Sequence, residues 1–148
     1  MATRLRRILH PSDFSPASRP AFRKALGLAK ANRAVLLVAH VLPPLPIFPD
    51  AYIPATTYDQ LARGQRAGGQ KQLDRLLGRV RTAGARASGI LVDVGVPAQQ
   101  IVRLAKSRRA DLIVIGTRGR TGLARTLLGS VAARVVALAS CPVLTVHA

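Results

Sequence analysis

Runs of apolar residues recur along the chain and are separated by segments with helical periodicity. The run Ala34–Val41 is apolar almost throughout, and Asp111–Gly116 places four apolar residues in succession after its aspartate. Such runs are typical of strands that are buried on both faces of a parallel sheet. Shorter stretches predict three further strands, at Arg4–His10, where Pro11 ends the strand, at Gly89–Val94 and at Cys141–Val146.

Apolar residues at helical spacing predict four helices between these strands. Phe22, Leu26 and Ala29 fall near one face of a helix that follows the first strand. A stripe of Leu73, Leu76, Leu77 and Val80 predicts helix in the second half of Asp59–Ala87, whereas Gly64, Gly68 and Gly69 make the first half doubtful. The last two helices are expected to begin at Gly95-Val96-Pro97 and at Gly129-Ser130.

The order of these elements defines the fold class. Strands and helices alternate, and the one long interruption is Leu42–Tyr58, which holds five prolines and is expected to be a loop. Alternation of this kind predicts a doubly wound α/β domain, with a parallel sheet, right-handed crossovers and helices on both faces. No internal repeat is evident, so residues 1–148 are interpreted as a single domain.

Composition narrows the possible functions. The 148 residues carry 23 basic and 6 acidic side chains, a net charge of +17, and the single cysteine excludes a disulfide framework or a Cys-based zinc cluster. No apolar run approaches the roughly 20 residues of a membrane span, and the basic N-terminus lacks the features of a signal peptide. We therefore expect a cytoplasmic protein.

The charge also bears on possible partners. The basic residues are spread along the chain, with Lys71, Arg75 and Arg79 on one face of a predicted helix, and no lysine block or base-stacking motif accompanies them. Nonspecific association with polyanions follows from the charge. Specific nucleic-acid recognition is left as an alternative.

Three segments are expected to meet at the carboxyl edge of the predicted sheet, where such folds bind ligands. They are His10–Ser15, His40–Leu42 and the glycine-rich, basic stretch Gly116–Ser130. This last stretch matches neither the P-loop nor the dinucleotide fingerprint. Its glycines and the helix start at Gly129-Ser130 nevertheless suit phosphate binding, because backbone N–H groups and the helix dipole favour an anion there. Arg118, Arg120 and Arg125 would add positive charge.

The spacing Gly116-x2-Gly119-x9-Gly129-Ser130 resembles the ATP-binding pattern of the universal stress protein family. The resemblance extends along essentially the whole chain and includes Ile8–Ser15, Asp111–Gly116 and Cys141-Pro142-Val143. It implies a five-stranded parallel sheet of order 3-2-1-4-5. It also implies a homodimer in which the last strands, Pro142–Val146, meet across a two-fold axis.

The resemblance further implies a role for each residue of the site. Asp13 would bond the ribose hydroxyls, the backbone of Val41 would contact adenine, and Gly116 would lie against the ribose. Pro11 would close the floor of the pocket. The phosphates would be held by Gly119, Gly129, Ser130 and Val131. The implied ligand is ATP, with or without Mg²⁺, and no residue is assigned as catalytic or as a metal ligand.

Several interpretations stay open at this point. Asp13 could serve only as a helix cap, and His10 and His40 could both reach the cleft. The expected function is that of a nucleotide-binding stress-response regulator or sensor rather than a dedicated enzyme. A slow ATPase and a basic nucleic-acid-binding protein are the alternatives, and ADP, AMP or a cyclic nucleotide could replace ATP.

Overall fold

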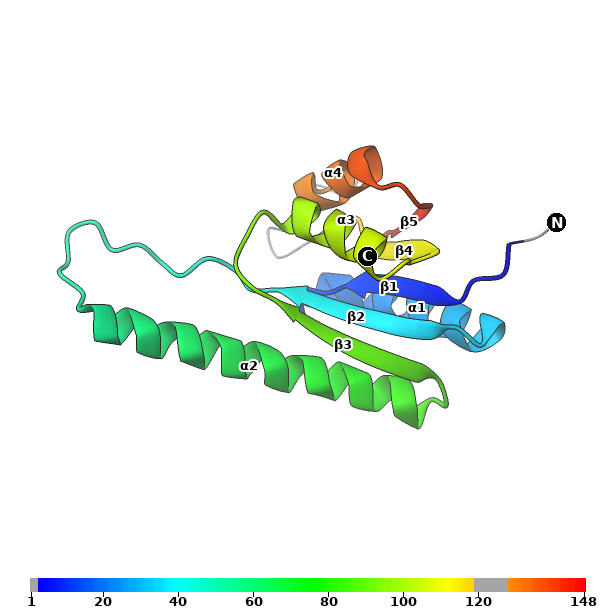
Figure 1. Ribbon diagram of the computed structural model, residues 1–148, viewed down its shortest axis with the longest axis horizontal. Helices are drawn as coiled ribbons and strands as arrows, with labels where there is room; N and C mark the ends of the chain where they lie inside the picture. Colours follow the sequence, from blue (N-terminus) through cyan, green and yellow to red (C-terminus); the bar gives the residue numbers. More distant parts are fainter. Residues whose placement is uncertain (1–2, 119–127) are drawn as a thin grey trace.

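Five parallel strands form the centre of the fold, in the order β3-β2-β1-β4-β5 (Figure 1). The computed structural model describes residues 3–118 and 128–148. The predicted sheet of order 3-2-1-4-5 is confirmed. The strands are β1 (Arg7–Pro11), β2 (Val35–Val41), β3 (Arg86–Val92), β4 (Leu112–Gly116) and β5 (Val143–Val146).

Helices cover both faces of this sheet, because successive strand residues point to opposite sides. Ile8, Leu36 and Val114 pack with helices α1 and α2, whereas their neighbours Leu9, Leu37 and Ile113 pack with α3 and α4. The α1 and α2 layer and the α3 and α4 layer are therefore separate cores on either side of one sheet. The helices are α1 (Arg19–Asn32), α2 (Ala55–Thr82), α3 (Pro97–Ser107) and α4 (Ser130–Leu138), with a short 3-10 turn, η1 (Pro16–Ser18), before α1.

Helix α2 is continuous over 28 residues, so the doubt raised by its glycines was wrong. Gly64 and Gly68 face open space, where a glycine costs helix propensity but disturbs no packing. Gly69 lies against the sheet, and a Cβ there would come within 3.1 Å of Leu42 Cδ2. Glycine therefore lets the helix approach the sheet closely. The half of α2 before Gly69 has no buried residue and extends beyond the sheet (Figure 1).

The remaining differences from the sequence prediction concern where elements begin and end. Strand β1 starts three residues later than expected and includes Pro11, which pairs with Ala39 of β2. The proline-rich loop ends at Pro54, because Ala55 begins α2. Strand β3 begins three residues earlier than predicted, at Arg86. Within the described ranges, no helix is both long and apolar enough to cross a membrane.

The parallel arrangement gives the sheet two chemically different edges. Loops that follow β1, β2, β3 and β4 leave from the carboxyl edge, and the loops that enter these strands meet at the amino edge. Helix α4 begins at the carboxyl edge, whereas α1, α2 and α3 end at the amino edge. The N-terminal segment also approaches from the amino edge (Figure 1).

Candidate functional site

A cavity of about 530 Å³ lies at the carboxyl edge of the sheet. It is lined by the loops that follow β1, β2, β3 and β4 and by the first turn of α4. Seven of the eight residues predicted from the sequence line it, and the eighth, Gly119, lies outside the described residues. The seven are Pro11, Asp13, Val41, Gly116, Gly129, Ser130 and Val131.

The loop after β1 is held in a tight turn by its own side chains. Oδ1 of Asp13 accepts a hydrogen bond from the backbone N–H of Ser15 at 2.9 Å, and Oγ of Ser12 accepts one from the N–H of Phe14 at 3.1 Å. Phe14 adopts a positive φ of 62°, a conformation that a bulky residue rarely takes. These side-chain bonds stabilise the turn and hold Asp13 at the cavity wall.

Asp13 is not a helix cap. The residue before η1 is Ser15 and the residue before α1 is Ser18, and neither helix start has a side-chain cap bond. The capping alternative raised from the sequence therefore does not describe this aspartate. It lines the cavity and bonds within its own turn.

The two histidines have different positions. His40 lines the cavity, its Nδ1 lies 2.8 Å from the carbonyl oxygen of Ser12, and its ring packs against Phe14 with centroids 4.2 Å apart. His10 does not line the cavity. It is fully buried beside Phe22 of α1, and its Nδ1 lies 3.0 Å from the carbonyl oxygen of Val114. The expectation that both histidines reach the cleft holds only for His40.

The electrostatics of His10 follow from this burial. Loss of water lowers the pKa of His10 to about 4, and this effect exceeds the opposing effects of the Val114 carbonyl and of the Asp13 charge. Its Nε2 is buried and has no hydrogen-bond partner among the described residues. His10 is therefore a neutral core residue at physiological pH.

The start of α4 closes the cavity from the α3 and α4 side. Gly129 precedes the helix, its N–H donates to the carbonyl oxygen of Thr117 at 2.6 Å, and among the described residues no side chain caps the helix start. A Cβ on Gly129 would come within 2.8 Å of the same Thr117 oxygen. Glycine is therefore required for this close approach of two loops. Within the described part of the chain, the first-turn N–H groups of α4 have no side-chain acceptor, which suits an anion.

A fourth segment lines the cavity and was not foreseen. Gly95, Val96 and Pro97 lie between β3 and α3 and form part of the wall, as do Pro43 and Pro44 after β2. The sequence identified the β3–α3 turn as a helix start but not as part of the site. The usable signal was topological, since every loop that leaves the carboxyl edge of a parallel sheet is a candidate for the binding cleft.

The charges at this cavity are few. Among the described lining residues Asp13 is the one carboxylate and Arg118 the one guanidinium. Arg120 and Arg125 lie outside the described residues. In residues 3–118 and 128–148 no group of three His, Cys, Asp or Glu side chains could hold a metal ion. The described part of the site therefore offers a carboxylate on one side, helix N–H groups on the other and an apolar wall between them.

Comparison with known proteins identifies the family of this chain. The family model described as the universal stress protein family matches residues 4–147. A universal stress protein of Methanocaldococcus jannaschii is 36% identical over 142 residues, which cover 95% of this chain and 81% of the relative. The chain therefore belongs to the universal stress protein family.

Solved structures agree with this assignment. A universal stress protein from Lactobacillus plantarum superposes with a TM-score of 0.81 and 26% identity, covering 99% of this chain and all of the other. A universal stress protein in complex with cAMP superposes with a TM-score of 0.69 and 28% identity, covering 98% of each chain.

Proposed function

We propose that the carboxyl-edge cavity binds an adenine nucleotide, with ATP as the ligand that its residues suit best. The observation that carries the proposal is the meeting, in one cavity, of Asp13, Val41 and the uncapped start of α4 at Gly129. These supply an acceptor for hydroxyl groups, a backbone beside an apolar wall, and donors for phosphate. A volume of about 530 Å³ is within the usual range for a small-molecule site.

Each residue has a proposed contact. Asp13 accepts hydrogen bonds from the ribose hydroxyls, because a carboxylate can serve two donors at once. The backbone of Val41 contacts the adenine edge, Gly116 lies against the ribose and Pro11 forms the floor. The phosphates lie at Gly129, Ser130 and Val131, together with Gly119. A Cβ at Gly116 would be in van der Waals contact with the carbonyl oxygens of Arg118 and Ala17, at 3.4 and 3.5 Å.

The relative solved with cAMP supports the class of ligand, since it has the same fold at 28% identity. The glycine spacing that ends at Gly129-Ser130 favours a nucleotide with a chain of phosphates. We therefore rank ATP, with or without Mg²⁺, above AMP and cyclic nucleotides.

We further propose that nucleotide occupancy serves regulation in a stress response rather than rapid turnover. Hydrolysis needs a base that activates water. Asp13 is the one carboxylate among the described lining residues, and its Oδ1 already accepts the Ser15 N–H. ATP occupancy would instead change the surface that a partner protein meets beside the start of α4.

Calorimetric titration tests the binding proposal. ATP should bind with a Kd of about 1 μM or tighter, about −8 kcal/mol, and should raise the melting temperature by mass action. Gly129→Ala should weaken ATP by about tenfold or more, about 1.4 kcal/mol, because its Cβ would meet the Thr117 carbonyl at 2.8 Å and displace the start of α4. ADP, AMP and cAMP, titrated in parallel, rank the ligands.

Gly27→Ala is the matched control. Gly27 lies in α1, and nothing stands within 4 Å of a Cβ at that position. The control should bind ATP like the unmodified protein. Absence of both heat and thermal shift at millimolar ATP with Mg²⁺ would overturn the proposal, as would equal losses in Gly129→Ala and Gly27→Ala. Phosphate release that disappears in Gly129→Ala would favour the slow ATPase instead.

A further inference from the structure

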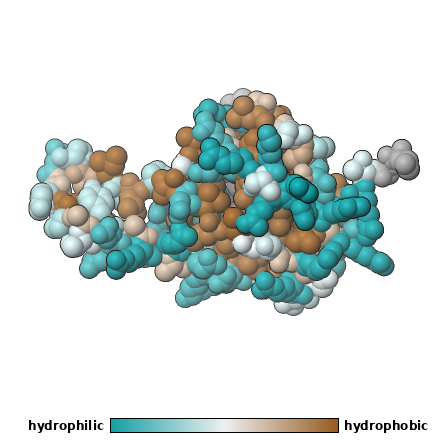
Figure 2. Space-filling view, in the orientation of Figure 1, coloured by the Kyte–Doolittle hydropathy of each residue, from teal (hydrophilic) through white to brown (hydrophobic). Residues whose placement is uncertain are grey.

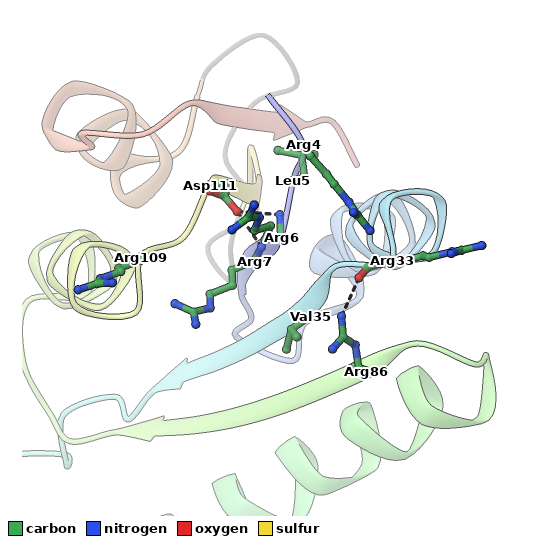
Figure 3. Close-up of a pocket in the computed structure, with 9 residues that line it drawn as sticks. All are labelled: Arg4, Leu5, Arg6, Arg7, Arg33, Val35, Arg86, Arg109 and Asp111. Carbon is green, nitrogen blue, oxygen red and sulfur yellow. Dashed lines mark hydrogen bonds between the residues drawn. The ribbon is translucent and has the colours of Figure 1, made fainter. Parts of the chain in front are cut away.

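A second cavity, of about 610 Å³, lies at the amino edge of the sheet, the opposite edge from the nucleotide cavity. It is bordered by the segment that enters β1 and by the first residues of β2 and β3 (Figure 3). Strand β1 has five residues, so about 17 Å of strand separates the two edges. We call it the amino-edge cavity, and its lining residues are Arg4, Leu5, Arg6, Arg7, Arg33, Val35, Arg86, Arg109 and Asp111.

Six arginines and one aspartate give this lining a formal charge of +5. The aspartate is bonded to the backbone, because Oδ2 of Asp111 accepts the backbone N–H groups of Arg6 and Arg7, at 2.7 and 2.9 Å. Within the described ranges the one ion pair is Arg66–Asp93, and neither of its members lines this cavity. The cavity therefore concentrates positive charge that Asp111, the one carboxylate among its described lining residues, offsets only in part.

A structural role accounts for only part of this charge. The Nη1 of Arg7 donates to the carbonyl oxygen of Arg108 at 3.0 Å, and the Nη2 of Arg86 donates to that of Arg33 at 2.9 Å. Both acceptors lie where a helix has just ended, and cations are favourable at that pole of the helix dipole. Each bond uses one of the five N–H donors of a guanidinium, so most of the donors remain for a ligand.

The other four arginines have no such explanation. Arg33 and Arg109 adopt positive φ angles of 54° and 53°, the conformation in which helices usually end with glycine. Their side chains extend outward on two sides of the cavity, whereas those of Arg4 and Arg6 lie above the start of β1 (Figure 3). Figure 2 shows hydrophilic atoms covering this end of the molecule, where the N-terminal segment leaves.

The chemistry of the lining defines the ligand. Guanidinium groups bind phosphate through paired, charge-assisted hydrogen bonds, and several of them around one cavity suit an anion with several phosphates. The described lining residues include no aromatic side chain on which a base could stack, and Leu5 and Val35 are the apolar ones. A volume of about 610 Å³ suits a compact anion rather than a duplex. We propose that the amino-edge cavity binds a chain of linked phosphates, of the kind found in inorganic polyphosphate.

Sodium tripolyphosphate is the probe, titrated into the full chain by calorimetry and by amide-resolved NMR. The amide resonances of Arg6, Arg7 and Arg86 should move on titration, and sodium sulfate at the same ionic strength should leave them largely in place. Movement confined to Gly129–Val131 would show that tripolyphosphate occupies the nucleotide cavity alone, and would overturn the proposal. ATP, titrated in parallel, should move the Gly129–Val131 resonances. Stronger movement of Arg6 and Arg86 with ATP than with tripolyphosphate would instead assign this cavity to nucleotides.

The double variant Arg4→Gln/Arg6→Gln removes two guanidinium groups and no side-chain hydrogen bond given by the structure. It should weaken tripolyphosphate by about tenfold, as expected for the loss of two charge-assisted contacts. The matched control, Arg63→Gln/Arg75→Gln, removes the same charge from exposed positions of α2 outside the cavity. It should weaken binding by no more than about twofold, because neither residue lines the cavity and salt screens exposed charges.

Equal losses in the two double variants would overturn the proposal, since tripolyphosphate would then respond to net charge alone. If Arg4→Gln/Arg6→Gln lowers the affinity for duplex DNA but not the affinity for tripolyphosphate, the surface would be assigned to nucleic acid instead. ATP binding at the carboxyl edge should be unchanged in both double variants. The binding proposals for the two cavities can therefore be confirmed or refuted independently.

Discussion

The buried His10 makes the fold sensitive to mild acid, and the size of the effect can be worked out. In the folded protein burial lowers the pKa of His10 to about 4, from an ordinary value of 6.5. The neutral ring faces the Val114 carbonyl through Nδ1, so the proton of the neutral form lies on Nδ1 and donates to that oxygen. A second proton would have to go to Nε2, which is buried with no partner among the described residues.

The direction of the pH effect on folding stability follows from the difference between the pKa of His10 in the folded and in the unfolded chain. Above pH 6.5 the histidine is neutral in both states and stability does not depend on it. Between pH 6.5 and 4 the unfolded chain takes up a proton that the folded protein does not, so stability falls as the pH falls. With these two pKa values, the loss reaches about 2 kcal/mol at pH 5 and about 3 kcal/mol at pH 4.

Urea unfolding at pH 7.5 and at pH 5.0 measures this loss. The unmodified protein should lose about 2 kcal/mol between these pH values. His10→Gln, which keeps a donor for the Val114 carbonyl, should be less stable at pH 7.5 and should lose much less on acidification. His147→Gln is the matched control, because it removes an exposed histidine that lies outside β1 and tests whether the loss of any histidine has the same effect.

Two results would refute this reasoning. One is an equal loss of stability on acidification in His10→Gln and in the unmodified protein. The other is an imidazole resonance of His10 that titrates near pH 6.5 in the folded protein. Either would mean that burial does not keep His10 neutral, and that another group carries the acid sensitivity.

Three further predictions concern assembly, packing and salt. Strand β5 lies at the edge of the sheet and has four partly buried residues, and an apolar edge strand favours pairing with another chain. Light scattering at tens of micromolar protein should therefore report a homodimer, formed through Pro142–Val146. A monomer at this concentration would contradict the prediction. Gly89→Ala should destabilise the fold by about 1–3 kcal/mol, since its Cβ would come within 2.6 Å of Leu77 Cδ1. Gly78→Ala, with nothing within 4 Å of its Cβ, should instead stabilise it by up to about 1 kcal/mol, and urea unfolding that fails to separate the two variants would refute the packing account. Raising the salt concentration from about 0.05 to 0.3 M should nearly abolish retention of the protein on DNA, while ATP binding stays measurable by calorimetry. Arg75→Glu/Arg79→Glu should weaken DNA retention and leave ATP binding unchanged. DNA binding that resists salt and depends on sequence would make the basic surface a recognition site.

The sheet was predictable because its central strands are buried on both faces. Ala34–Val41 and Asp111–Gly116 are apolar almost throughout, and such runs have few alternatives in a chain of this length. The first half of α2 was not predictable, since its stability as helix depends on where its glycines face. Gly69 helps the helix approach the sheet, and this benefit is a tertiary contact that propensity does not contain.

The candidate site was predicted in part for a similar reason. The glycine spacing and the turn at Asp13 are local signals, and seven of the eight predicted residues line one cavity. The wall formed by Gly95–Pro97 arises from how the β3–α3 crossover passes over the sheet. The burial of His10 was accessible from strand alternation, since Ile8 and His10 must share a face, and that face packs against α1.

The two cavities have a common origin in the polarity of a parallel sheet. Every crossover helix runs antiparallel to its strands, so helix starts gather at the carboxyl edge and helix ends at the amino edge. The carboxyl edge favours anions through backbone N–H groups, as in the first turn of α4. The amino edge presents helix carbonyls, which favour cationic side chains such as Arg7 and Arg86. More arginines line the amino edge than donate hydrogen bonds to helix carbonyls. The guanidinium groups that make no such bond form the proposed second anion site, whose contacts come from side chains. Glutamine substitution should therefore remove phosphate affinity at the amino edge, whereas at the first turn of α4 a change in backbone geometry, as in Gly129→Ala, is needed.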